Sequence, residues 1–186
     1  MNIFDIPKGE TYEATISIDS TGTRTKTTIR NINFIPTPDR LTISPNIDDS
    51  GVFKLIGEKS EILCKKLPHT PISSLGHNFS YELEDEERFT LELDFTSSSF
   101  SDLYKQIKAT PKQESVLAHS LLIEKDPDVV LHVSFHARDG KRTLQLNYHY
   151  EIKDDIEKAQ KVLGNFYDNY LHSKLANEKL ISKEYD

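Results

Sequence analysis

The sequence is poor in cysteine, with Cys64 as the only one among 186 residues. A single cysteine excludes an internal disulfide and fits a reducing compartment. The segment from Met1 to Pro7 has no cationic leader and no apolar run of signal-peptide length. No stretch approaches the roughly 20 apolar residues that would span a bilayer. We therefore expect a cytoplasmic protein without a membrane segment.

Excess positive charge is also lacking. The formal net charge is −7, and no segment is strongly basic, which argues against nucleic acid as a partner because phosphate neutralisation would supply little affinity. The apolar fraction of 36% includes nine Phe and eight Tyr, well above the composition of disordered chains. A chain of this length can bury one working core. We expect a single domain over residues 1–186, with 96–99 as an alternative sub-boundary.

Common enzyme signatures are missing as well. The segment from Gly51 to Ser60 has the wrong spacing for a phosphate-binding loop, and there is no G-x-S-x-G elbow, no H-E-x-x-H motif and no cysteine pair. Lys65 and Lys66 could activate the Cys64 thiol, but a small structural residue in a β-rich segment is the stronger interpretation. We predict no catalytic residues and no cofactor, and favour a non-enzymatic protein over an enzyme.

Strand signals dominate the N-terminal half. Segments rich in Thr, Ile and Val, or otherwise of β-type composition, predict strands over 10–18, 24–35, 41–46, 52–57 and 60–66. Residues 67–76 contain Pro and Gly and predict a loop. Over 78–95, apolar residues alternate with mostly acidic ones on both sides of an acidic turn. This alternation predicts a hairpin with one apolar and one acidic face.

The middle of the chain leaves two alternatives open. Serines at 97–99 interrupt the β pattern, and the spacing over 100–108 predicts a short helix. Thr110-Pro111 would begin a second helix over about 111–122. The alternation from Val116 to Ile123 fits a strand equally well, so residues 111–123 are either helix or strand.

The best-defined motif is a hairpin over 129–151 that turns at Asp139-Gly140. Asp-Gly favours the type I′ turn of a two-residue hairpin, which fixes the strand register. The predicted pairs are Ala137–Arg142, Phe135–Leu144, Val133–Leu146 and Leu131–Tyr148. Three of these pairs are apolar on both sides, so turn and register agree. We expect Phe135, Leu144, Val133 and Leu146 to be buried together.

The opposite face of this hairpin carries hydrogen-bonding side chains without formal charge. Its members are His132, Ser134 and His136 on the first strand and Thr143, Gln145, Asn147 and His149 on the second. Solvent-exposed sheet faces usually carry Lys and Glu. We predict that these residues bind a partner or ligand, with an ordinary sheet face as the plain alternative. His132 and His149 are diagonal neighbours but lack a third ligand, so we predict no metal site.

The C-terminal segment predicts an amphipathic helix over 154–175. Asp154 and Asp155 suit a helix N-terminus, and apolar residues recur at spacings of three and four from Ile156 to Tyr170. A glycine within a helix costs stability, so Gly164 would mark a close approach to the sheet.

Together these elements predict an α+β fold: a curved, mainly antiparallel β-sheet with the long C-terminal helix packed across it and one or two short helices between sheet segments. The expected function is a non-enzymatic interaction module, namely a subunit, adaptor or inhibitor that binds a protein partner or forms a homo-oligomer through a sheet face or edge. The alternative is a small-molecule binder with a cavity between sheet and helix, using tyrosines such as Tyr148, Tyr150, Tyr167 and Tyr170.

Overall fold

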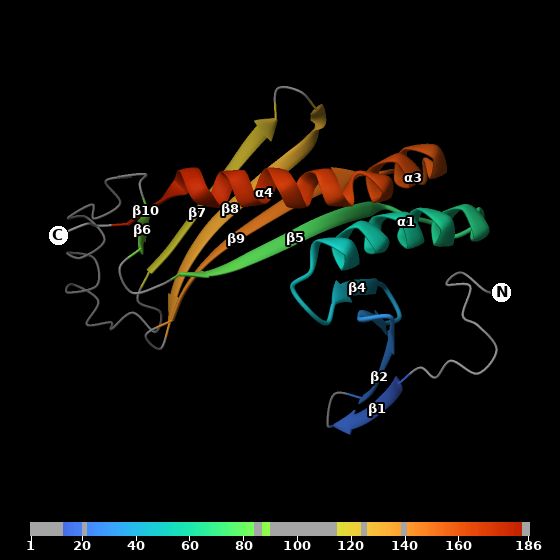
Figure 1. Cartoon of the computed structure of the whole chain (residues 1–186). Coiled ribbons are helices and arrows are strands. Elements are labelled where there is room, and N and C mark those ends of the chain that lie inside the picture. Colours follow the sequence, from blue (N-terminus) through green and yellow to red (C-terminus); the bar gives the residue numbers. More distant parts are fainter. Residues whose placement is uncertain are drawn as a thin grey trace, which may run out of the picture. The chain divides into compact units, whose positions relative to one another are not determined.

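The computed structural model describes residues 13–19, 22–83, 87–89, 115–123, 126–138 and 141–183. They form antiparallel sheets and helices, with helices near the C-terminal end (Figure 1), which confirms the α+β class; the curvature of the sheet stays a prediction. The chain divides into two compact units, one of residues 1–75 and 152–168 and one of 76–151 and 169–186. No helix of the described part is long and apolar enough to cross a membrane.

The first unit contains a four-stranded antiparallel sheet. Its strands follow the order of the sequence: β1 (Glu13–Asp19), β2 (Gly22–Ile29), β3 (Ile32–Pro36) and β4 (Leu41–Pro45). The single strand predicted over 24–35 is wrong, because the chain reverses at Arg30 and Asn31. These two residues have φ values of 49° and 62° and join paired residues Ile29 and Ile32. Positive φ at both turn positions is the type I′ geometry that suits a two-residue hairpin.

The strands predicted over 52–57 and 60–66 do not form. This segment is one helix, α1 (Ser50–Lys66), whose first turn is capped by Asp49. The Asp49 carboxylate accepts a hydrogen bond from the backbone N–H of Val52 at 3.0 Å. The buried side of α1 has helical spacing and comprises Val52, Phe53, Ile56, Gly57, Ser60 and Cys64. The cap and this periodicity outweigh the β-type composition.

Helix α3 (Ile156–Gly164) packs against α1 in the same unit (Figure 1). A glycine on α1 permits the close approach, because a Cβ at Gly57 would lie 3.4 Å from the carbonyl oxygen of Leu163. The contact predicted between Gly164 and the sheet is therefore a contact between helices, and a Cβ at Gly164 would meet Glu61 of α1 at 3.3 Å. Asp155 caps α3 by accepting a hydrogen bond from the backbone N–H of Lys158.

The core of the first unit is built from its sheet and α1. Ile32, Val52 and Ile56 are buried together, and partly buried apolar residues pack around them: Ile29, Phe34, Ile43, Leu55 and Phe166. The ring of Phe166 stacks on that of Phe53, with centroids 6.3 Å apart. Phe166 thus contributes to this core from the C-terminal part of the sequence.

The second unit contains a sheet in the order β5-β9-β8-β7. The strands are β5 (Ser74–Leu83), β7 (Ser115–Ile123), β8 (Asp126–Arg138) and β9 (Lys141–Glu151). Phe135 pairs with Leu144 and Val133 with Leu146, so the predicted hairpin and its register are confirmed. Its turn residues, Asp139 and Gly140, lie outside the described residues. Of the two alternatives for 111–123, the strand is correct over 115–123.

Burial on this hairpin follows the predicted alternation with one exception. Val133, Leu144 and Leu146 are buried, with exposed fractions of 5%, 0% and 0%. Phe135 is only half-buried, so the expectation that all four apolar residues are buried together is wrong for this residue.

The hairpin predicted over 78–95 does not form in its described part. β5 is hydrogen-bonded to β9, and β6 (Glu87–Phe89) pairs instead with β10 (Ile181–Lys183). Alternation shows that a segment is a strand and which face it buries, but it does not identify the neighbouring strand. The helix predicted over 100–108 and the alternative sub-boundary at 96–99 lie outside the described residues.

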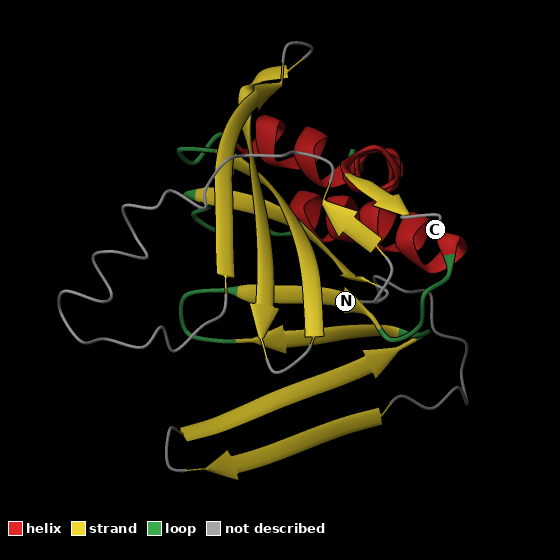
Figure 2. Cartoon of the chain, turned by 90° about the vertical axis from the view of Figure 1, so that its left-hand side faces the viewer, coloured by secondary structure: helices red, strands yellow, loops and turns green. Residues whose placement is uncertain are grey.

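The predicted C-terminal helix is two helices. α3 ends at Gly164, and after Asn165 the chain continues as α4 (Phe166–Leu180). In the second unit α4 lies against one face of the sheet, beside β5 and β9 (Figures 1 and 2). The other face of this sheet is the one that carries the predicted binding residues.

Candidate functional site

The seven predicted binding residues lie together on the face of β8 and β9 that is turned away from α4. His132 lies opposite Asn147, Ser134 opposite Gln145, and His136 opposite Thr143. His132 and Gln145 are exposed, and the other five residues are half-buried. The structure therefore brings these residues together as expected; their role in binding stays a prediction.

Neighbouring side chains on this face interact with one another. His136 Nε2 lies 3.0 Å from Ser134 Oγ, and the rings of His132 and His149 have centroids 6.1 Å apart. The Asn147 Oδ1 atom is buried and accepts no hydrogen bond within the described part of the chain. An unsatisfied buried acceptor costs stability, and a donor on a bound molecule would remove that cost.

The same face continues onto β5, which sequence analysis did not anticipate. Asn78 and Ser80 are exposed there, between the buried residues His77 and Phe79 and the half-buried Tyr81. A Cβ at Gly76 would lie 3.4 Å from Asn147 Oδ1 and 3.5 Å from Asn78 Nδ2, so this glycine lets the two asparagines lie close together. We call the seven predicted residues, together with Asn78 and Ser80, the outward face.

An ion pair lies beyond the uncharged residues of the outward face. Lys141 Nζ is 2.9 Å from Glu82 Oε1, and both side chains are largely exposed. Exposed ion pairs stabilise a fold by at most about 1 kcal/mol, so this contact adds little to the stability of the sheet. Glu84, Glu92 and Asp94, which belong to the same acidic stretch, lie outside the described residues.

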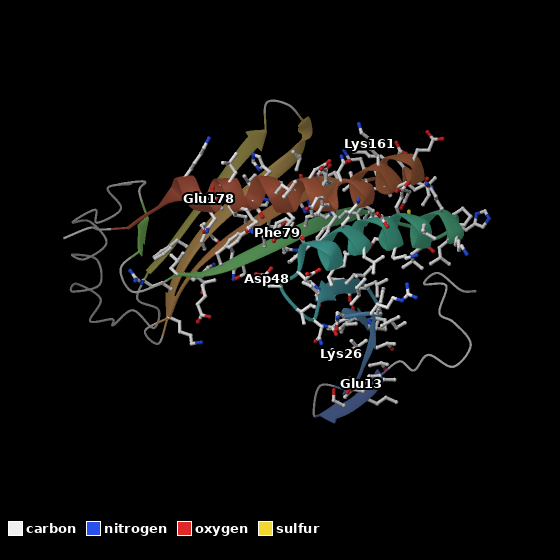
Figure 3. All side chains as sticks on the ribbon, viewed as in Figure 1. Glu13, Lys26, Asp48, Phe79, Lys161 and Glu178 are labelled. Carbon is white, nitrogen blue, oxygen red and sulfur yellow. The ribbon has the colours of Figure 1, made fainter. Side chains whose placement is uncertain are left out.

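The opposite face of the sheet is joined to α4 by partly buried polar contacts. The Tyr81 hydroxyl is 2.6 Å from Ser173 Oγ, and the Tyr148 hydroxyl is 2.6 Å from His172 Nδ1. Phe79, labelled in Figure 3, packs among these groups, with its ring centroid 6.1 Å from that of Tyr170. Burial raises the pKa of Tyr148, so its hydroxyl remains protonated and can donate to the imidazole.

Two of the four tyrosines of the small-molecule alternative thus bond to α4. Besides Tyr148, the Tyr150 hydroxyl accepts a hydrogen bond from Asn169 Nδ2 at 2.6 Å. Tyr170 is buried on α4 itself, and Tyr167 belongs to the first unit. Two of the four hydroxyl groups expected to hold a small molecule therefore make contacts between sheet and helix.

His77 should make the stability of the protein depend on pH. Its side chain is 3% exposed, Nδ1 lies 2.9 Å from Asn169 Nδ2, and burial lowers its pKa from 6.5 to about 4. As the pH falls below 6.5, the unfolded chain binds a proton that the folded chain does not, so the free energy of unfolding decreases until the pH reaches about 4. At about 1.4 kcal/mol per pKa unit, the expected loss is about 3 kcal/mol.

Urea titrations at several pH values between about 7 and about 4 would measure this loss. His77→Gln keeps a polar side chain that can face Asn169 and cannot titrate, so its stability should fall less steeply over the same range. An identical pH dependence in both proteins would assign the acid sensitivity to other groups.

The thiol of Cys64 does not have the properties of an activated nucleophile. Cys64 is buried on α1 rather than on a strand, and burial raises the pKa of its thiol. This is the opposite of the shift that activates a nucleophile.

Among the described residues, no group of three or more His, Cys, Asp or Glu side chains could hold a metal ion.

Comparisons with protein-family models, with curated proteins and with solved structures find no match for this chain. The chemistry of the site is therefore the basis for assigning a function.

Proposed function

We propose that the protein is a non-enzymatic interaction module, acting as a subunit, adaptor or inhibitor, that binds a protein partner through the outward face. The observation that carries this proposal is the composition of that face. It spans three neighbouring strands, β5, β9 and β8, with hydrogen-bonding side chains at nine positions. With neutral histidines, none of these nine residues carries a formal charge.

The chemistry of desolvation supports a contact role. Burying a charge beneath a partner is costly unless an opposite charge compensates it. Ser, Thr, Asn, Gln and neutral His can instead exchange water for hydrogen bonds with the partner. Protein interfaces accordingly have few charges at their centre and a polar rim. Glu82 and Lys141 are exposed beside this uncharged area, as expected for a rim.

The proposal further includes a cytoplasmic location, which the single cysteine supports.

Charge substitutions on the outward face would test the proposal. Gln145→Lys and Asn147→Glu should leave the protein folded but reduce partner capture at least tenfold. A loss of about 1.4 kcal/mol of binding free energy weakens the binding constant by that factor. Quantitative mass spectrometry of proteins captured from native extract by the wild type and by each variant would measure the loss.

Thr42→Lys and Thr42→Glu are matched controls, because Thr42 is an exposed residue of β4 in the β1-β2-β3-β4 sheet. Proteins that the wild type captures should be retained by both controls and lost by both outward-face variants. An equal loss of partner capture in all four variants would indicate a general effect of charge. No loss of capture in the Gln145 and Asn147 variants would show that the outward face is an ordinary exposed sheet face.

A further inference from the structure

We infer that the outer edge of β7 binds β7 of a second copy of this chain. The β5-β9-β8-β7 sheets of the two copies would then join across a two-fold axis. This edge is separate from the outward face, and the inference does not depend on the function proposed above.

β7 lies at one end of the sheet order β5-β9-β8-β7. Its residues pair with β8, and no other strand of the described part pairs with it. A strand in this position directs alternate backbone N–H and C=O groups away from the sheet. Those groups form a ready template for one more strand.

The other outer strands carry features that discourage such pairing, and β7 does not. Natural sheet edges are protected by charges and by proline, and glycine weakens a strand. β1 has an acid at each end, Glu13 and Asp19, β4 ends at Pro45, and β5 contains Gly76 and Glu82. The nine residues of β7, Ser115–Ile123, include no formal charge, no proline and no glycine.

The irregularity in the pairing of β7 with β8 leaves most of β7 regular. The register with β8 shifts between Leu122 and Ile123, at the very end of the strand. A bulge of this kind ends pairing locally. Residues 115–122 therefore remain as a continuous strand for a partner.

The sequence of β7 is self-complementary about its centre, which identifies the partner. With a two-fold axis at His119, antiparallel pairing places Leu117 opposite Leu121 and Val116 opposite Leu122 of the second copy. No pair in this arrangement opposes like charges, which would be destabilising. The same operation on β1, with the axis at Ile16, would place Glu13 opposite Asp19.

This register also continues both faces of the sheet. Within one chain, Leu117 and Leu121 pair with Phe135 and Leu131, whereas Ala118 and Ser120 pair with Ser134 and His132. Across the axis, Ala118 lies opposite Ser120 of the second copy. On the face of Leu117 and Leu121, leucine meets leucine on either side of His119, which lies opposite its own copy. On the other face, Ala118 meets Ser120 beside the axis, and Val116 meets Leu122 farther from it. A contact of this self-complementary kind closes as a symmetric dimer.

Paired charge variants would test the inference. Ala118→Glu with Ser120→Glu, and separately Ala118→Lys with Ser120→Lys, would each bring four like charges together across the axis. Both positions pair with uncharged polar residues of β8, so each variant should fold. Light scattering should give the wild type twice the 21.3 kDa mass of one chain and each variant half of the wild-type value. An equal mixture of the Glu and Lys variants should restore the dimer.

Several results would overturn the inference: a monomeric wild type at every concentration, dimers that persist in both variants, or a mixture that stays monomeric. Circular dichroism would establish whether the variants are folded. If the variants are unfolded, isotope-filtered NOE spectra of mixed labelled and unlabelled wild type would test the dimer directly. The proposed pairing requires NOEs between Leu117 of one copy and Leu121 of the other. Gln145→Lys should leave the dimer mass unchanged, which separates this edge from the outward face.

Discussion

Phe166→Asp is expected to abolish soluble, cooperatively folded protein. The ring of Phe166 stacks on Phe53 at 6.3 Å and packs against the cluster of Ile32, Val52 and Ile56. Loss of a fully buried phenylalanine costs about 3–5 kcal/mol; for the partly buried Phe166 the low end of this range applies, and an unpaired charge in apolar surroundings adds to it. The sum approaches the total stability of an ordinary domain, about 5–15 kcal/mol. Soluble yield and thermal unfolding followed by circular dichroism would measure the effect.

Leu171→Asp is the matched control, because it introduces the same charge on the same helix at a residue that is 48% exposed. That variant should remain folded, and Phe166→Leu should retain most of the stability. A cooperatively folded Phe166→Asp protein, or a stable domain after truncation at residue 153, would show that the C-terminal helices are an appended element rather than part of the core.

Leu146→Ala should lower the free energy of unfolding by about 2–5 kcal/mol. Leu146 is 0% exposed and lies opposite Val133 at the centre of the β8–β9 ladder. Removing its branched end loses apolar burial and leaves a cavity that neighbouring strands cannot close. Urea unfolding should show a lower midpoint with an unchanged m-value.

Gln145→Ala provides the comparison for this prediction. Gln145 precedes Leu146 on the same strand but is exposed on the other face, so its replacement should change stability by about 0.5 kcal/mol or less. Equal losses from the two substitutions would contradict the assignment of Leu146 to the buried face.

The β8–β9 hairpin could be predicted because its determinants are close together in the sequence. The Asp139-Gly140 turn and the apolar alternation each specify the register, and they agree. The neighbour of β5 could not be predicted in this way. β5 lies beside β9, more than fifty residues further along the chain, and this pairing has no turn signal in the sequence. For the same reason Asn78 and Ser80 were missed as members of the outward face.

Helix α1 shows a different limit. Its Ile and Leu residues and the two glycines Gly51 and Gly57 resemble short strands separated by turns. The evidence for a helix was also present, in the Asp49 cap and in the spacing of Val52, Ile56 and Ser60. Gly57 was placed at the end of the predicted strand over 52–57. Its role as a helix contact depends on α3, a segment about a hundred residues away, and could not be recognised from the local sequence.

The order in which the chain is synthesised sets the time at which the first unit can be completed. That unit combines residues 1–75 with 152–168, and residues 76–151 are made in between. At about 5–20 residues per second, this interval lasts about 4–15 s. Until α3 emerges from the ribosome, the apolar side of α1 lacks the helix that covers it near Gly57. The nascent chain is therefore most exposed to premature association in the interval before residue 168 is added.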